Sequence, residues 1–289
     1  MKKRIFETKT KKDVDKGMKI TNLIENIQGS QEVLFEHGLC FYIETAKHEI
    51  LADCGQTDAF LKNAETLQIN LKEVDTVFLS HGHYDHSGGI LPFAEINPQA
   101  DIYMQKKAML PYYHKTDDEE RYIGIDPVIS KLTQVKLVDG DRKIDEELSL
   151  FSNVTGRTLW PKGNLELKKK TENGFVQDEF DHEQYLVVTE GNKRVLFSGC
   201  AHNGILNILA HYYELYGMYP DAVVSGFHMK KKEYTTEDDA LITETAKQLL
   251  EMPTRFYTGH CTGEYAFAIM KEIMGSQLTY VHSGDSFIL

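Results

Sequence analysis

The sequence is poor in cysteine: only four occur in 289 residues, at Cys40, Cys54, Cys200 and Cys261. Their spacing forms neither the paired pattern of a zinc finger nor a disulfide framework of the kind found in small secreted proteins. We therefore expect free thiols and a reducing compartment, and the cytoplasm is the predicted location.

Long apolar runs are also missing. No stretch is long and apolar enough to cross a bilayer, and the basic N-terminus lacks the apolar segment of a secretory signal. The formal net charge of -12 argues against a broad nucleic-acid-binding face. The expected partner is a small-molecule substrate, with no nucleic acid and no membrane; a homo-oligomer is compatible with this composition.

The length suits one large α/β domain with a full core. Residues 1–17 are rich in lysine and lack apolar periodicity, which predicts a flexible N-terminal tail, and the domain is expected over 18–289. Alternating apolar residues predict strands at 18–25, 38–44 and 48–53, followed by a helix over 58–67. The polar segment 161–181 is expected to be a loop and a candidate lid, and 106–126 an insertion near the site. A helix over 236–250 is expected to begin with a capping box formed by Thr236 and Asp239, and the last strand is expected over 279–289.

The most informative stretch is Ser80-His81-Gly82-His83-Tyr84-Asp85-His86, which directly follows an apolar strand predicted over 74–79. A strand that ends in this way presents three imidazoles and one carboxylate at one edge of a sheet. Two histidines one residue apart can reach one cation, and the Asp-His pair after them can reach a second. Imidazole and carboxylate together suit zinc, iron or manganese.

Three further histidines follow apolar strands, where the same sheet edge would present them. They are His202 in Gly-Cys-Ala-His-Asn-Gly-Ile, His228 in Val-Val-Ser-Gly-Phe-His, and His260 in Thr-Gly-His-Cys-Thr-Gly. For His228 and His260, a core histidine is the alternative.

The His-x-His-x-Asp-His motif after a strand resembles the metallo-β-lactamase superfamily. This resemblance implies an αββα sandwich of two mixed sheets flanked by helices, with a two-metal site. It implies that His81 and His83 hold one cation, and that Asp85, His86 and His260 hold a second. Asp53, in Leu-Ala-Asp-Cys-Gly, is then expected to orient a ligand histidine from behind.

The chain departs from the superfamily pattern at two points. Arg157 stands where the third histidine of the first site is expected, and Gly199-Cys200 stands where a bridging aspartate is expected. His202 is therefore a candidate for the missing imidazole, and Cys200 is either a thiolate ligand or a small buried residue. These features, with Gly-Phe-His and Gly-His-Cys-Thr-Gly, resemble the branch named for 7,8-dihydropterin-6-methyl-4-(β-D-ribofuranosyl)-aminobenzene-5′-phosphate synthase.

The resemblance implies a metal-dependent hydrolase that uses a metal-bound hydroxide on a small phosphorylated or heterocyclic substrate, with two zinc ions expected and iron or manganese as alternatives. Asp85 is expected to steer the hydroxide, and His228 to act as an acid or hydrogen-bond donor. Arg157 and Lys230 are the candidate substrate-binding cations. The alternative function is a synthase-type transfer that releases diphosphate.

Overall fold

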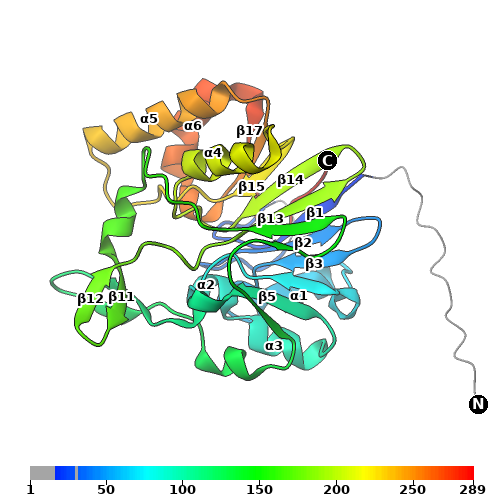
Figure 1. Ribbon diagram of the computed structural model, residues 1–289. Helices are drawn as coiled ribbons and strands as arrows, with labels where there is room; N and C mark the ends of the chain where they lie inside the picture. The colour runs from blue at the N-terminus through cyan, green and yellow to red at the C-terminus, as the bar shows by residue number, and fades with distance from the viewer. Residues whose placement is uncertain (1–16, 30–31) are drawn as a thin grey trace, which may run out of the picture.

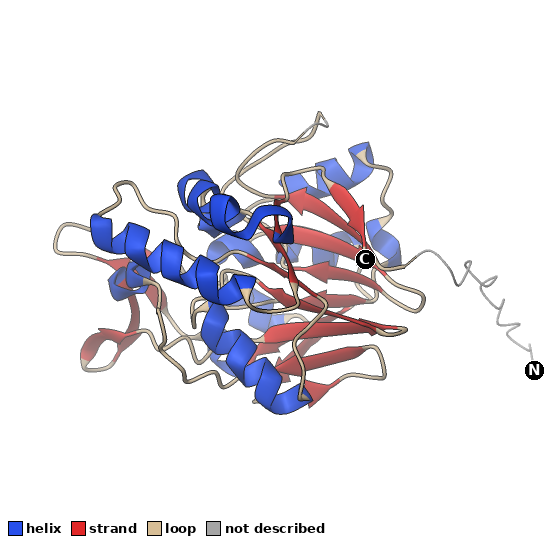
Figure 2. Ribbon diagram, turned by 90° about the horizontal axis from the view of Figure 1, so that it is seen from above, coloured by secondary structure: helices blue, strands red, loops and turns tan. Residues whose placement is uncertain are grey.

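The computed structural model describes residues 17–29 and 32–289, and it shows the predicted αββα arrangement. Two sheets pack face to face, with helices over both outer surfaces (Figures 1 and 2). The expected tail at 1–17 lies outside the described residues except for Gly17, and the predicted domain boundary stays a prediction. Among the described residues, no helix combines the length and the apolar character that a bilayer crossing requires.

The two large sheets have seven strands each. The first has the order β18-β1-β2-β3-β4-β5-β8, formed by Ser286–Ile288, Lys19–Ile24, Cys40–Glu44, Glu49–Ala52, Thr76–Phe78, Asp101–Gln105 and Val135–Val138. The second has the order β17-β16-β15-β14-β13-β10-β9, formed by Leu278–Tyr280, Arg255–Thr258, Ala222–Ser225, Lys193–Ser198, Tyr185–Glu190, Leu148–Phe151 and Arg142–Lys143. In each sheet four consecutive strands are parallel: β3-β4-β5-β8 in the first and β14-β15-β16-β17 in the second.

The helices cover the two outer faces, with the second sheet beneath α4, α5 and α6 and the first above α1 and α3 (Figure 1). Their bounds are Ala59–Thr66 for α1, Tyr84–Ser87 for α2, Ile90–Ile96 for α3, Ile205–Tyr216 for α4, Thr236–Leu250 for α5 and Glu264–Met274 for α6. Short 3-10 turns lie at Leu71–Glu73, Lys106–Met109, Pro127–Lys131, Lys162–Glu166, His260–Thr262 and Gly275–Gln277.

Central strands are apolar on both faces because both faces are buried. Along β14, Leu196 joins the cluster beneath α4–α6, whereas Val195 and Phe197 join the cluster between the sheets. Along β4, Val77 faces the α1 and α3 layer and Phe78 faces the opposite sheet. Strands in such a position show continuous apolar runs instead of strict alternation, which explains why the segments before His81, Cys200 and His228 could be recognised as buried strands.

A third, four-stranded sheet has the order β12-β11-β6-β7 and extends beyond the sandwich (Figure 1). It consists of Gly174–Gln177, Leu167–Thr171, Tyr112–Lys115 and Glu120–Tyr122. The insertion expected at 106–126 supplies half of it. The loop expected at 161–181 is wrong: this segment supplies β11 and β12, because Leu167–Lys169 pair with Tyr112–His114. A lysine-rich strand was hard to recognise because its backbone pairing, and not an apolar face, holds it.

Two further expectations differ from the structure. The last predicted strand is two strands in different sheets, β17 and β18, separated by a turn in which Gly284 has a φ of 88°. The capping box of α5 is formed by Thr235 and Asp238, one residue before the predicted pair.

The first large sheet is joined to the second by Gln184, which is fully buried before β13. Its backbone N donates to Ser80 O at 2.8 Å, and its side-chain Nε2 donates to Leu79 O at 2.8 Å. The loop that carries His81 therefore begins at a position fixed by a residue of the opposite sheet.

We expect Gln184→Ala to lower the free energy of unfolding by roughly 1–3 kcal/mol, because buried carbonyl oxygens would lose their donor. Gln248→Ala is the control, since the side chain of Gln248 donates to Glu244 Oε1, one turn earlier on α5, in an exposed pair. A change within about 0.5 kcal/mol is expected there. Chemical denaturation measures both, and equal effects would contradict the bridging role of Gln184.

The capping residue Asp238 also holds the segment that follows His228, because Lys231 Nζ donates to its Oδ1 at 2.6 Å. Burial alone would raise the pKa of the Asp238 carboxyl, but hydrogen bonds from Lys231 and Thr235 lower this pKa from 3.8 to about 2. A lowered carboxyl pKa stabilises the fold fully above the unfolded value, and this stabilisation is lost as the pH falls through the folded value.

Asp238→Asn is therefore expected to lower the free energy of unfolding by about 1–2 kcal/mol at pH 7. The difference from wild type should shrink as the pH falls from about 4 to about 2. Unfolding curves at several pH values measure this, with Asp239→Asn on the same helix turn as control; a difference independent of pH would argue against an ionised Asp238.

Candidate metal centre

The ligand-type side chains of the first sheet lie on a tight loop after β4. His81, His83, Asp85 and His86 are all buried, and the last two belong to α2. Gly82 permits this packing, because a Cβ atom there would collide with the carbonyl oxygen of Ala108. The structure thus places the four predicted ligand residues on one compact loop at the end of this strand, and their role as ligands stays a prediction.

The second sheet presents its candidates at the carboxyl ends of three adjacent parallel strands. Cys200 and His202 follow β14, His228 follows β15, and His260 follows β16. His228 and His260 each have a φ of 50°, in the left-handed region that non-glycine residues seldom adopt. Such backbone strain costs on the order of 1–3 kcal/mol and concentrates at functional sites.

The structure brings these residues from the two sheets together in two adjoining groups. In the first, the ligand atoms of His81, His83 and His202 all lie within 4.8 Å of one another, and the Nε2 atoms of His81 and His202 are 3.3 Å apart. His202 therefore occupies the place expected for a third imidazole.

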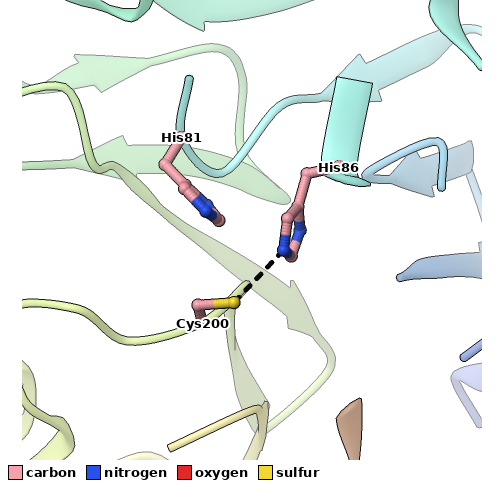
Figure 3. A group of neighbouring side chains, drawn as sticks. All are labelled: His81, His86 and Cys200. Atoms are coloured by element: carbon pink, nitrogen blue, oxygen red, sulfur yellow. Dashed lines mark hydrogen bonds between the residues drawn. The ribbon is translucent and has the colours of Figure 1, made fainter. Parts of the chain in front are cut away.

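In the second group, Asp85 Oδ2 lies 3.4 Å from His260 Nε2 and 3.6 Å from His86 Nε2. The thiol of Cys200 lies where the two groups meet, 3.2 Å from His86 Nε2 and close to His81 (Figure 3).

Four of these imidazoles are fixed through their Nδ1 atoms. The partners are Ser80 Oγ for His81 at 2.8 Å, Asp53 Oδ2 for His86 at 2.6 Å, Asn164 Oδ1 for His202 at 3.0 Å, and Asn26 Oδ1 for His260 at 3.0 Å. A protein oxygen on Nδ1 sets the ring orientation and leaves Nε2 for a cation. Asp53 was expected to orient a ligand histidine, and the structure shows that the ring it contacts is that of His86.

Electrostatics keep most of these groups in the form that a metal requires. Burial and the neighbouring imidazoles lower the pKa of His81 and His202 far below 6.5, and they lower that of His83 to about 3. Burial alone would raise the pKa of Asp85, but His86, His260 and His37 hold it well below its usual range. His86 differs: burial would lower its pKa, but the carboxylates of Asp53 and Asp85 raise it to about 9. The neutral imidazoles and the ionised carboxylate are already in the state that binds a divalent cation, whereas His86 must release a proton to bind one.

Two polar atoms inside the site show where a cation fits. Among the described residues, neither His83 Nε2 nor His260 Nε2, both buried, has a hydrogen-bond partner. A buried polar atom without a partner is costly. A cation bound in the first group would give His83 Nε2 a partner, and a cation bound in the second group would do the same for His260 Nε2. These residues therefore fit a divalent metal.

The site opens into a cavity of about 180 Å3. Its inner wall contains Asp85, Cys200, His202, His228 and His260, and its rim contains Tyr84, His114, Arg121, Ile123 and Leu167, most of them from the third sheet. A larger hollow of about 520 Å3 lies over β9 and β10, lined by residues such as Arg142 and Glu146. We assign the chemistry to the smaller cavity, because it contains the grouped metal-ligand atoms.

The two predicted substrate-binding cations lie elsewhere. Arg157 is bonded to Asn203 Oδ1 and Glu179 Oε2 and stacks on Trp160. Neither Arg157 nor Lys230 is among the described residues that line the cavity. Their predicted role stays a prediction, and His228 is the predicted substrate-facing residue that does reach the cavity.

Sequence reasoning missed several residues of the site. His37 lies 3.4 Å from Asp85 and lines the cavity, and Arg121 donates to the Tyr84 hydroxyl at 3.1 Å on the rim. His182 is fully buried and accepts from Gly82 N at 2.9 Å, which fixes the loop between His81 and His83. Cys261 also lines the cavity, and its place directly after His260 was the signal that could have found it.

Comparison with known proteins agrees with this geometry. Residues 34–166 match the family model of the metallo-β-lactamase superfamily. The chain is 28% identical over 295 residues to 7,8-dihydropterin-6-methyl-4-(beta-D-ribofuranosyl)-aminobenzene-5′-phosphate synthase of Methanocaldococcus jannaschii, covering 93% of this chain and 95% of that protein.

Two solved structures show the same fold. Tm1679, a metal-dependent hydrolase of the β-lactamase superfamily, is 28% identical with a TM-score of 0.77, covering 94% of this chain and 99% of its own. Zn2+-bound PqqB from Methylobacterium extorquens is 14% identical with a TM-score of 0.55, covering 94% and 100%. At that identity the second likeness concerns the fold alone.

The position of Asp53 generates a prediction for metal affinity. The two carboxylate oxygens of Asp53 contact His86 Nδ1 and accept from the backbone N and Oγ of Ser80. Asp53→Asn replaces this carboxylate by an amide, so the affinity for Zn2+ should fall about 10- to 100-fold. Competition with a chelator measures it. Asp58→Asn makes the same chemical change at an exposed helix end and should leave the affinity unchanged; equal affinities in both variants would remove Asp53 from this role.

Proposed function

We propose that this chain is a member of the metallo-β-lactamase superfamily, which the family match over 34–166 and the 28% identical relatives support, and that it is a metal-dependent hydrolase of a small phosphorylated or heterocyclic substrate. The observation that carries the proposal is the convergence of buried imidazoles and the Asp85 carboxylate from two sheets on one cavity of about 180 Å3. The Nε2 atoms of His83 and His260, for which the described part of the chain offers no hydrogen-bond partner, support it further.

In this proposal His81, His83 and His202 hold one divalent cation, and Asp85, His86 and His260 hold the second. Cys200, beside His86, adds a sulfur ligand on that side. Zinc suits such a mixture of nitrogen, oxygen and sulfur donors, with iron or manganese as alternatives. When bound, a cation of this kind lowers the pKa of water from ~15.7 to about 7 and polarises the bond under attack.

Two groups of the chain complete the proposed chemistry. The Asp85 carboxylate, kept ionised by the imidazoles around it, orients the attacking water. His228, whose ring lies 4.1 Å from that of His202 and lines the cavity, donates a proton or a hydrogen bond to the leaving group. The third sheet closes the cavity on its outer side and restricts the size of the substrate.

The rim supports a flat or anionic substrate. Tyr84 offers a ring face, and the guanidinium of Arg121 lies 5.8 Å from the centre of that ring. Arginine can bind phosphate oxygens through two N–H groups. Arg121 is thus better placed for this role than Arg157 or Lys230, which remain the sequence-based candidates.

A synthase-type transfer that releases diphosphate is the second candidate. The observation in its favour is the relative of that name from M. jannaschii, whose similarity extends over nearly the whole of both chains. Diphosphate release that requires a second organic substrate would identify the transferase, whereas product formation from one substrate and water would identify the hydrolase.

Location and partners complete the proposal. Four buried free cysteines suit a reducing compartment, so we propose the cytoplasm, with a small molecule as partner and neither nucleic acid nor membrane. A homo-oligomer remains compatible with this proposal.

The decisive variant is His83→Ala. We expect it to remain folded but to lose metal and activity, because its Nε2 is a buried atom with no other partner among the described residues. Elemental analysis gives metals per chain, circular dichroism reports folding, and a panel of phosphoesters and lactones reports activity. His211→Ala, on the outer part of α4 beside Glu214, is the matched control. Unchanged metal content in His83→Ala would refute the assigned site.

A further inference from the structure

We propose that Cys200, His228 and Cys261 form a third site, for a soft cation, beside the two cation positions assigned above, and that it shares the Cys200 sulfur with the second of them. The ligand atoms of these three residues all lie within 4.8 Å of one another. Two sulfur ligands at ~2.3 Å from a tetrahedral zinc ion lie roughly 3.8 Å apart, so a group of this size fits one such ion. The binding of the cation does not depend on the proposed hydrolase activity.

The topology of the second sheet places the three residues together. Cys200 follows β14, His228 follows β15 and Cys261 follows β16, and these strands are adjacent and parallel. Their carboxyl ends therefore meet at one edge, so the group is built on the rigid part of the fold and not on a mobile loop. Cys200 and Cys261 are both buried but line the cavity, which gives a cation a route to them.

Local packing holds the cluster in place. The backbone N of His228 donates to Cys261 Sγ at 3.3 Å, and the backbone N of Met229 donates to Cys261 O at 2.9 Å. Gly226 leaves room for the sulfur, because a Cβ atom there would collide with Cys261 Sγ. The segment around His228 is thus folded onto Cys261, and the left-handed backbone at His228 fits this arrangement.

The donor set distinguishes this site from its neighbours. Two sulfurs and one imidazole select zinc, cadmium or copper(I) and disfavour the hard cations that prefer oxygen. Three protein ligands leave one position of a tetrahedral ion open toward the cavity. Cys200 lies between this site and the second histidine group, and His228 is also the proposed proton donor, so a soft cation bound here would withdraw His228 from that role.

The test uses Cd2+ as the probe and the ultraviolet thiolate-to-cadmium absorption as the signal, in the full chain stripped of metal. We expect Cys261→Ser to lose at least half of this absorption and one equivalent of bound Cd2+. His228→Ala should keep the absorption but need about tenfold more Cd2+ or more for half-saturation. Cys40→Ser removes a thiol buried in β2 and should match wild type.

The proposal would be overturned if Cys261→Ser had the same thiolate-to-cadmium absorption and bound the same number of Cd2+ ions as wild type. Cys200 would then bind metal without Cys261. Differential alkylation provides a measurement without any variant: Cd2+ should protect Cys200 and Cys261 from iodoacetamide, and absence of protection would also overturn it. His83→Ala should retain the cadmium absorption, which separates failure of this site from failure of the proposed hydrolytic centre.

Discussion

The centre depends on one repeated interaction, the hydrogen bond between an imidazole Nδ1 and a protein oxygen. Ser80, Asp53, Asn164 and Asn26 each hold one histidine in this way. The rings are buried and crowded, and without these bonds they could rotate or turn outward. With them, the Nε2 atoms converge. Ser80, Asp53 and Asn26 follow strands of the first sheet, and Asn164 lies in the turn before β11. Two of the histidines that they hold, His202 and His260, follow strands of the second sheet, so correct packing of the sandwich is a condition for the geometry of the centre.

Buried carboxylates fix the backbone of the same loops from behind. Glu25 accepts from the N of His260 at 3.0 Å, and Glu183 accepts from the N of His202 at 2.6 Å. Burial raises the pKa of both glutamates, yet each has several donors around it. Together with Gln184, these residues attach the loops of His260, His202 and His81 to other parts of the chain. The loop of His228 is held instead by Cys261, whose Sγ accepts from His228 N at 3.3 Å.

The sequence was most informative for features that depend on residues close together in the chain. A buried strand followed by ligand residues can be read from a few positions, so the loop after β4 and the histidines after β14, β15 and β16 were found. The strands of the third sheet were not found, because β11 is a run of lysines that is held by pairing with β6. In this pairing Lys168 lies opposite Tyr113, 55 positions earlier in the chain. The same reason explains why Arg121 and His37 were missed: only the long-range fold brings them to the cavity. Arg157 was chosen by its position in a motif, and its partner Glu179 could not be foreseen.

The third sheet has a hydrophobic cluster of its own, formed by Tyr112, Ile123, Leu167 and Phe180. It is assembled from two insertions, yet it supplies most of the cavity rim and none of the grouped histidines that face each other across the two sheets. In the proposed function, the residues that select the substrate and the residues that hold the metal therefore belong to different stretches of the chain. Substitutions in the third sheet would then change which molecule fits the cavity without moving the grouped histidines.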